Sequence, residues 1–400
     1  MKDSVNVDME QGNVDSPGKS SISAGENSAS VFSMPRRFLI APDKFKGSLS
    51  ASEAADAIAA GVRRNFPEAE LDLCPIADGG EGFMATLAPT LNARWISCPA
   101  VDPLGRAIES RYLLADTAEG LTAILEMAET SGLWRLTAAE RNPLLTSTKG
   151  TGEQIAHAIR EYGVTRVILG IGGSATNDGG IGMAAALGVI FLGENGAVVD
   201  PNPAKLMEVR NVDLQNRLPL PEIIAACDVE NPLLGPNGAT AVFSRQKGAG
   251  AEDQILLEAA LAHLVSVSGG ENAANTPGAG AAGGLGFGLL HFTGARLISG
   301  FDLLADLLGL EARIAAADHV ITGEGSIDHQ SLSGKGPVAL AKMARDLGKP
   351  VTGFCGLADD AARDSGIFQQ IHALADTGLP LETLISQAGP LLTEMVAKSD

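Results

Sequence analysis

Two copies of the sequence Asp-Gly-Gly-x-Gly are the clearest candidates for chemistry in this chain. They are Asp78-Gly79-Gly80-Glu81-Gly82 and, a hundred residues later, Asp178-Gly179-Gly180-Ile181-Gly182. Each copy follows an apolar run typical of a strand and precedes a helical pattern, which is where α/β proteins bind ligands. Paired glycines let a ligand approach the backbone, N–H groups at a helix start favour anions, and the aspartate suits Mg²⁺ or proton transfer. Both copies therefore indicate phosphate chemistry, with solvent-exposed Asp-Gly turns as the alternative.

A third candidate is the loop Asp43-Lys44-Phe45-Lys46-Gly47-Ser48, which follows a strand expected at residues 37–41. Two lysines around one aromatic residue, at the carboxyl end of a strand, form a compact cationic site for phosphate or carboxylate. A solvated basic turn is an equally good interpretation of this loop alone.

A fourth candidate follows a strand expected at residues 319–322. Here Thr322-Gly323-Glu324-Gly325-Ser326-Ile327-Asp328 leads to Ser333-Gly334-Lys335-Gly336-Pro337. The two acids suit a metal, and Lys335 enters the start of a helix, where phosphate binds well. The spacing is not that of a Walker A loop, because His329 stands where that motif needs glycine. We interpret the segment as a metal–phosphate site.

Two further glycine patterns imitate a dinucleotide fingerprint. Gly170-Ile171-Gly172-Gly173-Ser174-Ala175 has the right spacing after a strand, but Thr176-Asn177-Asp178-Gly179-Gly180 adds more loop before any helix can start. The fingerprint needs the helix to begin within the glycine run. We therefore favour an anion- or metal-binding loop, and keep a dinucleotide-dependent oxidoreductase of a small hydroxy acid as the alternative. Gly278-Ala279-Gly280-Ala281-Ala282-Gly283 has no strand before it, which predicts close helix packing instead.

These candidates need elements that position them. Ser50 and Glu53 form a capping-box pattern before a helix with an apolar face, and a strand is expected at residues 71–76, which together give a β–α–β unit. The C-terminal part repeats the pattern with a helix at 337–347 and strands at 351–355 and 371–374.

The simplest architecture is α/β, with two domains. Residues 35–88 and 281–400 are expected to form a doubly wound parallel-sheet domain of the flavodoxin or Rossmann type. It is split by an inserted second α/β domain at residues 89–280, with the active site in the cleft between the two. Residues 1–34, which are rich in Ser, Asn, Gly and Asp, are expected to be a disordered tail.

Composition narrows the function classes. The formal net charge of −19 argues against nucleic acid and anionic membranes as partners. The four cysteines lie far apart with no Cys-x-x-Cys pair, which fits a reducing compartment and neither a disulfide framework nor a zinc site. No apolar run reaches the length of about 18 residues that a membrane span needs. We expect a cytoplasmic protein that acts on small molecules, and leave open whether it forms a homo-oligomer.

In their order along the chain, four motifs resemble those of the bacterial type I glycerate kinases. They are Pro42 to Ser48, Ala77 to Gly82, Gly172 to Gly180, and Thr322 to Gln330 with Gly334-Lys335. The similarity runs from about residue 36 to residue 395, nearly the whole expected folded chain. Lys149 and His329 depart from the pattern, being bulkier or more charged than the family leads us to expect.

The resemblance implies ATP- and Mg²⁺-dependent phosphorylation of D-glycerate, usually to 2-phosphoglycerate, with the 3-phosphate as an alternative product. It does not tell which aspartate accepts the hydroxyl proton or which lysine binds which anion. A non-catalytic sensor of a phosphorylated metabolite is a competing hypothesis, but it does not explain two metal-friendly acids near a lysine. The implied roles are catalysis for Asp178, Asp78 and Lys46; substrate binding for Lys44, Ser174 and Asn177; nucleotide binding for Lys335, Gly334, Gly323 and Gly325; and metal binding for Glu324 and Asp328.

Overall fold

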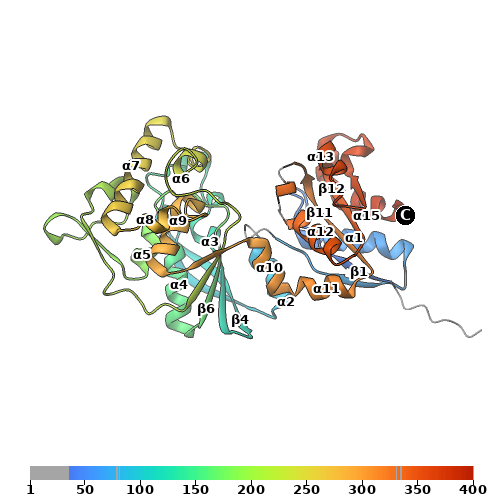
Figure 1. Cartoon of the computed structure of the whole chain (residues 1–400), viewed down its shortest axis with the longest axis horizontal. Coiled ribbons are helices and arrows are strands. Elements are labelled where there is room, and N and C mark those ends of the chain that lie inside the picture. The colour runs from blue at the N-terminus through green and yellow to red at the C-terminus, as the bar shows by residue number, and fades with distance from the viewer. Residues whose placement is uncertain (1–35, 78–79, 81, 330, 334–335, 400) are drawn as a thin grey trace, which may run out of the picture. The chain divides into compact units, whose positions relative to one another are not determined.

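The computed structural model of the chain describes residues 36–77, 80, 82–329, 331–333 and 336–399. Residues Pro35–Asp400 form one compact unit, which contains a five-stranded sheet, a six-stranded sheet and a two-stranded ribbon (Figure 1). The tail expected at residues 1–34 lies outside the described residues. Among the helices that are described, none is both long and apolar enough to cross a membrane.

The five-stranded sheet is parallel throughout, and its strand order is β2-β1-β11-β12-β13. Numbered within this sheet alone, the order is 2-1-3-4-5, which is the doubly wound flavodoxin-like order. Its topological switch point lies between β1 and β11, where ligands bind in such sheets. The doubly wound fold expected from the sequence is confirmed. The strands are β1 (Arg37–Ile40), β2 (Glu70–Leu73), β11 (His319–Ile327), β12 (Val351–Ala358) and β13 (Gln370–Ala373).

The helices of this sheet follow the expected local signals. Helix α1 (Ala51–Asn65) begins after Ser50, whose side chain accepts from the Glu53 backbone while the Glu53 carboxylate accepts from Ser50 N at 2.8 Å. The reciprocal bonds satisfy two N–H groups that a helix start leaves open. Helix α12 (Gly336–Asp346) joins β11 to β12, and α15 (Ala388–Lys398) packs against α1. Helices α1, α12 and α15 are visible beside the strands in Figure 1.

Strand β11 differs from the expectation. The sequence predicted a strand at residues 319–322 and a loop after it, but the strand continues to Ile327 and stays paired with β12. In the sequence, the small residues of this segment suggest a loop. In the structure, they allow the backbones of β11 and β12 to lie close together. A Cβ added at Gly323 would collide with the carbonyl oxygen of Phe354. Glu324 and Gly325 are therefore strand residues.

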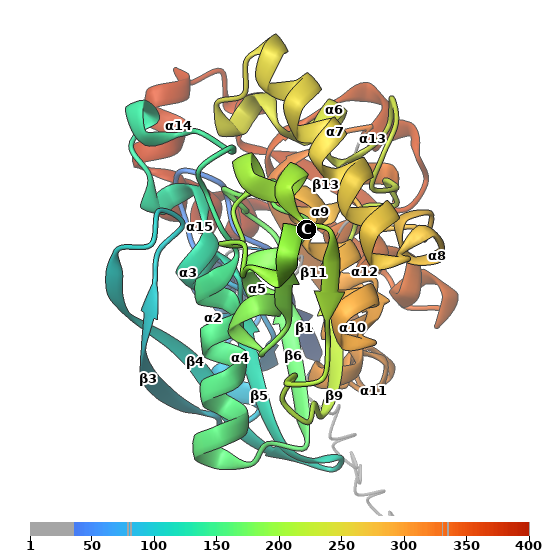
Figure 2. The same cartoon turned by 90° about the vertical axis from the view of Figure 1, so that its left-hand side faces the viewer.

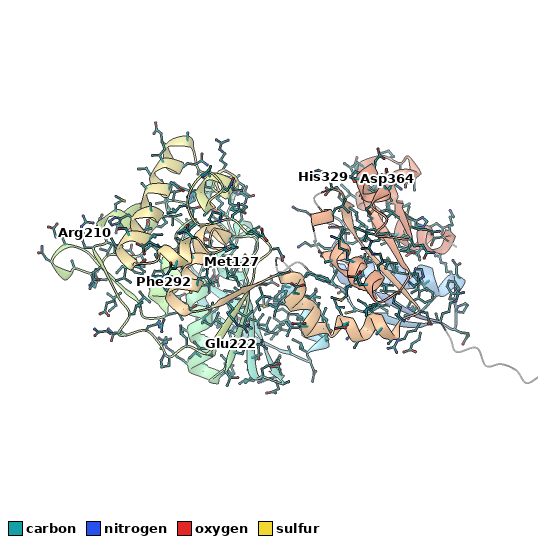
Figure 3. The ribbon with its side chains drawn as sticks, viewed as in Figure 1. Met127, Arg210, Glu222, Phe292, His329 and Asp364 are labelled. Atoms are coloured by element: carbon teal, nitrogen blue, oxygen red, sulfur yellow. The ribbon has the colours of Figure 1, made fainter. Side chains whose placement is uncertain are left out.

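The six-stranded sheet is mixed, in the order β10-β9-β6-β5-β4-β3 (Figure 2). Strands β3, β4 and β5 form an antiparallel meander, and β5, β6, β9 and β10 run parallel. Met127 follows the carboxyl end of β5 and Glu222 begins β9, so the two mark opposite ends of this sheet (Figure 3). The strands are β3 (Arg94–Val101), β4 (Ala107–Thr117), β5 (Gly120–Glu126), β6 (Arg166–Gly170), β9 (Glu222–Ala226) and β10 (Arg296–Ile298).

Several helices and the ribbon complete this part of the chain. Helix α2 (Phe83–Thr90) packs against β4 and β5 of the six-stranded sheet. Strand β10 is part of the same sheet, because it pairs with β9. The division of the chain into two domains stays a prediction. The other elements used below are α4 (Lys149–Tyr162), α5 (Ile181–Ala186), α6 (Ala239–Phe243), the short 3-10 turn η5 (Arg245–Lys247), α7 (Ala251–Ser268) and α9 (Ala281–Gly288); the ribbon consists of β7 (Ile190–Leu192) and β8 (Asn211–Asp213).

Candidate active site

Asp178, in the second Asp-Gly-Gly copy, is fully buried and accepts four hydrogen bonds. Its Oδ2 accepts from Thr148 N and Thr148 Oγ1, both at 2.8 Å, and from Gly182 N at 3.3 Å; its Oδ1 accepts from Gly180 N at 3.0 Å. Burial raises the pKa of Asp178, and the hydrogen bonds oppose this shift. The carboxylate thus ties the loop to the starts of α4 and α5. The proposed proton-accepting role of Asp178 stays a prediction that this geometry does not favour.

The loop that carries Asp178 does not have the geometry of a dinucleotide turn. Strand β6 ends at Gly170, but α5 begins only at Ile181. Between them the chain makes an isolated antiparallel bridge, Gly132 with Ser174, and Ala175 N donates to Ser131 O at 2.9 Å. The long interposed loop expected from the sequence is therefore present, and it is fixed to the chain that follows β5.

Asn177 and Ser174 are also held from the segment that contains α6 and η5. Asn177 Nδ2 donates to Thr240 Oγ1 at 3.1 Å, and the Asn177 Oδ1 atom is buried without a hydrogen-bond partner among the described residues. Ser174 Oγ accepts from Lys247 Nζ at 2.7 Å. Ser174 and Asn177, two of the three predicted substrate-binding residues, thus lie in one cluster with Asp178.

Lys247 is a residue that sequence reasoning missed. Its side chain is 1% exposed, and its Nζ donates to Ser174 Oγ at 2.7 Å and to Thr176 O at 2.6 Å. Burial lowers the pKa of Lys247 to about 7, although the negative charge of Asp178 acts in the opposite direction. In the sequence this lysine stands in a polar turn between Gln246 and Gly248, where nothing distinguishes it from a solvated lysine.

Glycines of α9 pack directly against the backbone of the loop that carries Asp178. Gly283 has φ +69°, and a Cβ there would collide with Thr176 O and lie 2.7 Å from the Asn177 Cα. A Cβ at Gly288 would lie 2.8 Å from Gly180 Cα. The glycine run around residues 278–283 thus serves close backbone packing, as the sequence predicted.

The first Asp-Gly-Gly copy is mostly outside the described residues, including Asp78. What is described is the start of α2, which Glu126 holds: the Glu126 carboxylate, 7% exposed, accepts from Met84 N at 2.7 Å. Burial raises the pKa of Glu126, and the N–H groups of Met84 and Gly82 and the charge of Lys44 oppose this. Sequence reasoning missed Glu126, although an acid that ends an apolar strand is an available signal.

The lysine loop lies beside the extended end of β11. Asp43 N donates to Gly323 O at 2.8 Å, and a Cβ at Gly325 would lie 3.1 Å from Lys46 N. Phe45 is buried in the core, whereas Lys46 is exposed and Lys44 is half-buried. The aromatic residue thus anchors a loop whose lysines remain at or near the surface, next to the switch point between β1 and β11.

Glu324 and Asp328 are half-buried at the carboxyl end of β11, which His329 marks in Figure 3. Asp328 Oδ1 accepts from Ser331 N at 3.0 Å. Within the described part of the chain no group of three or more His, Cys, Asp or Glu side chains gathers in a way that could hold a metal. Two carboxylates still suit Mg²⁺, which usually keeps waters and binds one or two carboxylates together with substrate phosphates. Gly334 and Lys335 lie outside the described residues.

The glycerate kinase family model matches residues 38–399. This chain belongs to the glycerate kinase family. It is 42% identical to the glycerate kinase of Bacillus subtilis over 363 residues, which cover 88% of this chain and 94% of that protein. It is also 42% identical over 344 residues to the glycerate 2-kinase of Escherichia coli, covering 84% and 88% of the two chains. The match to a kinase family and the geometry of the loop after β6 both argue against the oxidoreductase alternative.

The fold agrees with a solved structure from the same family. The crystal structure of a putative glycerate kinase 2 from Salmonella typhimurium superposes with a TM-score of 0.78 at 37% identity. The superposition covers 91% of this chain and 96% of that chain. The α/β fold described here therefore has a counterpart along nearly its whole length.

Proposed function

We propose that this protein transfers the terminal phosphoryl group of ATP to the 2-hydroxyl of D-glycerate, with Mg²⁺. The observation that carries the proposal is that the loop with Lys44 and Lys46 lies against the end of β11, where Glu324 and Asp328 stand. Cations and acids thus meet at the switch point of a flavodoxin-like sheet, where phosphate ligands bind. The choice of the 2-hydroxyl rests on the similarity to the Escherichia coli glycerate 2-kinase.

Phosphoryl transfer asks a protein to position the reactants and neutralise charge. In our proposal the glycerate hydroxyl oxygen forms the new bond to the γ-phosphorus while the bond to the ADP oxygen breaks. Lys44 or Lys46 binds the glycerate carboxylate or the transferring phosphoryl group, and which of the two lysines does so stays open. Lys335 and Gly334 bind a nucleotide phosphate, and the nucleotide lies near Gly323 and Gly325 of β11.

Glu324 and Asp328 are the residues we propose for Mg²⁺. Their oxygen donors match a hard cation, and their partial exposure leaves room for water and phosphate as further ligands. When bound, Mg²⁺ neutralises charge on the β- and γ-phosphate oxygens. Removal of the ion with EDTA should abolish turnover, and addition of excess Mg²⁺ should restore it.

An aspartate is proposed to accept the proton of the glycerate hydroxyl. Both oxygens of Asp178 already accept hydrogen bonds inside the protein, so Asp78 is the better candidate for this role. The variant D78N should lower kcat by roughly 100- to 10,000-fold, the usual contribution of a general base, with little change in thermal stability. If D78N keeps more than about a tenth of the turnover, below that contribution, Asp78 is not the base.

The direct test is ADP release from the purified full chain. ATP, Mg²⁺ and D-glycerate together should give turnover, and omission of any one should remove it. Turnover that does not depend on D-glycerate would contradict the proposal. Equally, a folded protein that binds ATP but does not act on D-glycerate would show that this family member uses another substrate.

A further inference from the structure

We propose that Ser174 and Lys247 form the subsite for the carboxylate of the substrate, with Lys247 as the residue that selects an anion. This inference deepens the proposed function and rests on it. It assigns the carboxylate to the loop after β6, and so leaves the two lysines after β1 for phosphate.

The hydroxyl of Ser174 has one proton, for which the residues described by the structure offer no acceptor. An ammonium group can only donate, so Ser174 Oγ must be the acceptor in its 2.7 Å contact with Lys247 Nζ. The proton of Ser174 is then available to another group, and among the described residues no acceptor for it is found within hydrogen-bond distance. Ser174 is 9% exposed while Lys247 is 1% exposed, so in our proposal the ligand contacts the hydroxyl and not the ammonium. A carboxylate oxygen at Ser174 would complete the chain of donors.

Within the described part of the chain, no carboxylate forms a salt bridge with Lys247, although the buried charge of Asp178 acts on it. Its two hydrogen-bond partners, Ser174 and Thr176, are neutral. The charged groups on the surrounding elements are Asp178, which is occupied by four donors, Arg141, whose backbone abuts Gly248, and Arg245 on the same turn, which is exposed. A buried ammonium is costly without a partner. A carboxylate bound at Ser174 would add a second negative charge near the ammonium, besides that of Asp178.

The neighbouring contact between Thr240 and Asn177 gives a matched control. It comes from the same α6–η5 segment and holds the same loop, but it carries no charge. If Lys247 only fixed the loop, loss of the Thr240 contact should have a similar effect on substrate binding. If Lys247 recognises the anion, only loss of its charge should weaken glycerate.

The test is calorimetric titration of D-glycerate into the full chain and its variants. K247M should weaken the Kd by roughly 10- to 100-fold, the usual range for a hydrogen bond to a charged group. S174A should approach the same loss, while K247R should keep most of the affinity and T240V should lose less than about threefold. D-Glyceramide, which lacks the charge, should bind wild type and K247M with similar Kd values.

The pH dependence separates recognition from loop holding. Because glycerate should favour the protonated lysine, the wild-type Kd should rise above about pH 7, where the free lysine loses its proton. The rise should reach up to about tenfold per pH unit, and the Kd of K247M and K247R should not follow it.

The outcomes distinguish this inference from the proposed function. Unchanged glycerate affinity in K247M, or an equal loss in T240V, overturns the inference whether or not the wild type shows turnover. Wild type that binds D-glycerate through Lys247 but releases no ADP leaves the subsite in place and overturns the kinase proposal. Wild type that neither binds nor phosphorylates D-glycerate overturns both.

Discussion

The loop after β6 and the loops after β1 and β11 lie at the carboxyl ends of strands, but the protein treats their polar side chains differently. After β6, Asp178 and Asn177 are buried and fixed by hydrogen bonds from several elements. After β1 and β11, Lys46 is exposed and Glu324 is half-buried. The polar groups of Asp178 and Asn177 hold their loop in place, whereas the side chains of Lys46 and Glu324 remain at least partly accessible to a ligand.

We infer from this difference that the polar groups of the two regions have different functions. A charged group that is already satisfied inside the protein cannot readily exchange its partners for a substrate, because each lost hydrogen bond to a buried charge is costly. A group that still contacts water can. We therefore expect substitutions of Asp178 and of the glycines packed against its loop to act mainly on stability, and substitutions after β1 and β11 to act mainly on turnover.

The largest expected effect is on stability, at Asp178. D178A leaves the donors on Thr148, Gly180 and Gly182 buried without their acceptor. With about 1–3 kcal/mol for each such group, the free energy of unfolding should fall by more than about 4 kcal/mol. D328A, at the end of β11, should lower it by less than about 1 kcal/mol, since Asp328 is half-buried and water can replace it as the acceptor for Ser331 N. Urea unfolding of both variants measures this, and equal losses would remove the distinction between the regions.

A glycine pair provides the next comparison. In G283A the new methyl group meets the Thr176 carbonyl, and the backbone has φ +69°. Left-handed strain and overpacking together should cost about 2–4 kcal/mol. In G325A the new atom lies 3.1 Å from Lys46 N and φ is not positive, so stability should change little while turnover falls. Thermal unfolding and ADP release report the two effects; a stable, fully active G283A would contradict the packing argument.

The third prediction concerns Lys46. Because this lysine is exposed, K46A should leave the melting temperature nearly unchanged but lower kcat/KM by about a hundredfold, which is about 2.7 kcal/mol. The matched control is K205A, which removes an exposed lysine paired with Asp200 at 3.6 Å and should keep full activity. Equal activity in the two variants would exclude Lys46 from the site.

The fourth prediction is a pH dependence of stability without substrate. The pKa of Lys247 is about 7 in the folded protein and 10.5 as its ordinary value. Between these two pH values, Lys247 carries a proton in the unfolded chain but not in the folded protein, so the stability of the wild type should rise with pH relative to that of K247M. Below pH 7 the lysine is protonated in both states, and the folded protein bears the full free-energy cost of the buried charge. Melting temperatures of both proteins from pH 6 to 10 test this sign. A difference that falls with pH would contradict it.

Local signals in the sequence predicted much of the fold. The capping box at Ser50 and Glu53 marked the start of α1, and the β–α–β pattern led to the parallel sheet that the structure contains. The end of β11 was not predictable in this way, because its glycines and serine resemble a loop. Only the pairing with β12 explains why residues up to Ile327 remain in a strand.

The candidate site was predictable where it depends on motifs and not where it depends on burial. The motifs identified Ser174, Asn177 and Asp178, which the structure brings into one cluster. They could not reveal Lys247, because its importance comes from contacts with residues about seventy positions away. Glu126 is a similar case, since its partner Met84 lies on another element.

The central claim is that the product carries its phosphate at C2 of D-glycerate. Proton-coupled phosphorus NMR of the reaction mixture tests it most directly, because phosphorus on the C2 oxygen couples to one proton and phosphorus on the C3 oxygen couples to two. The account predicts that a doublet appears as ATP is consumed. A triplet would show the 3-phosphate and contradict the proposed pose of the substrate, and the absence of any new phosphoester would contradict the proposed activity itself.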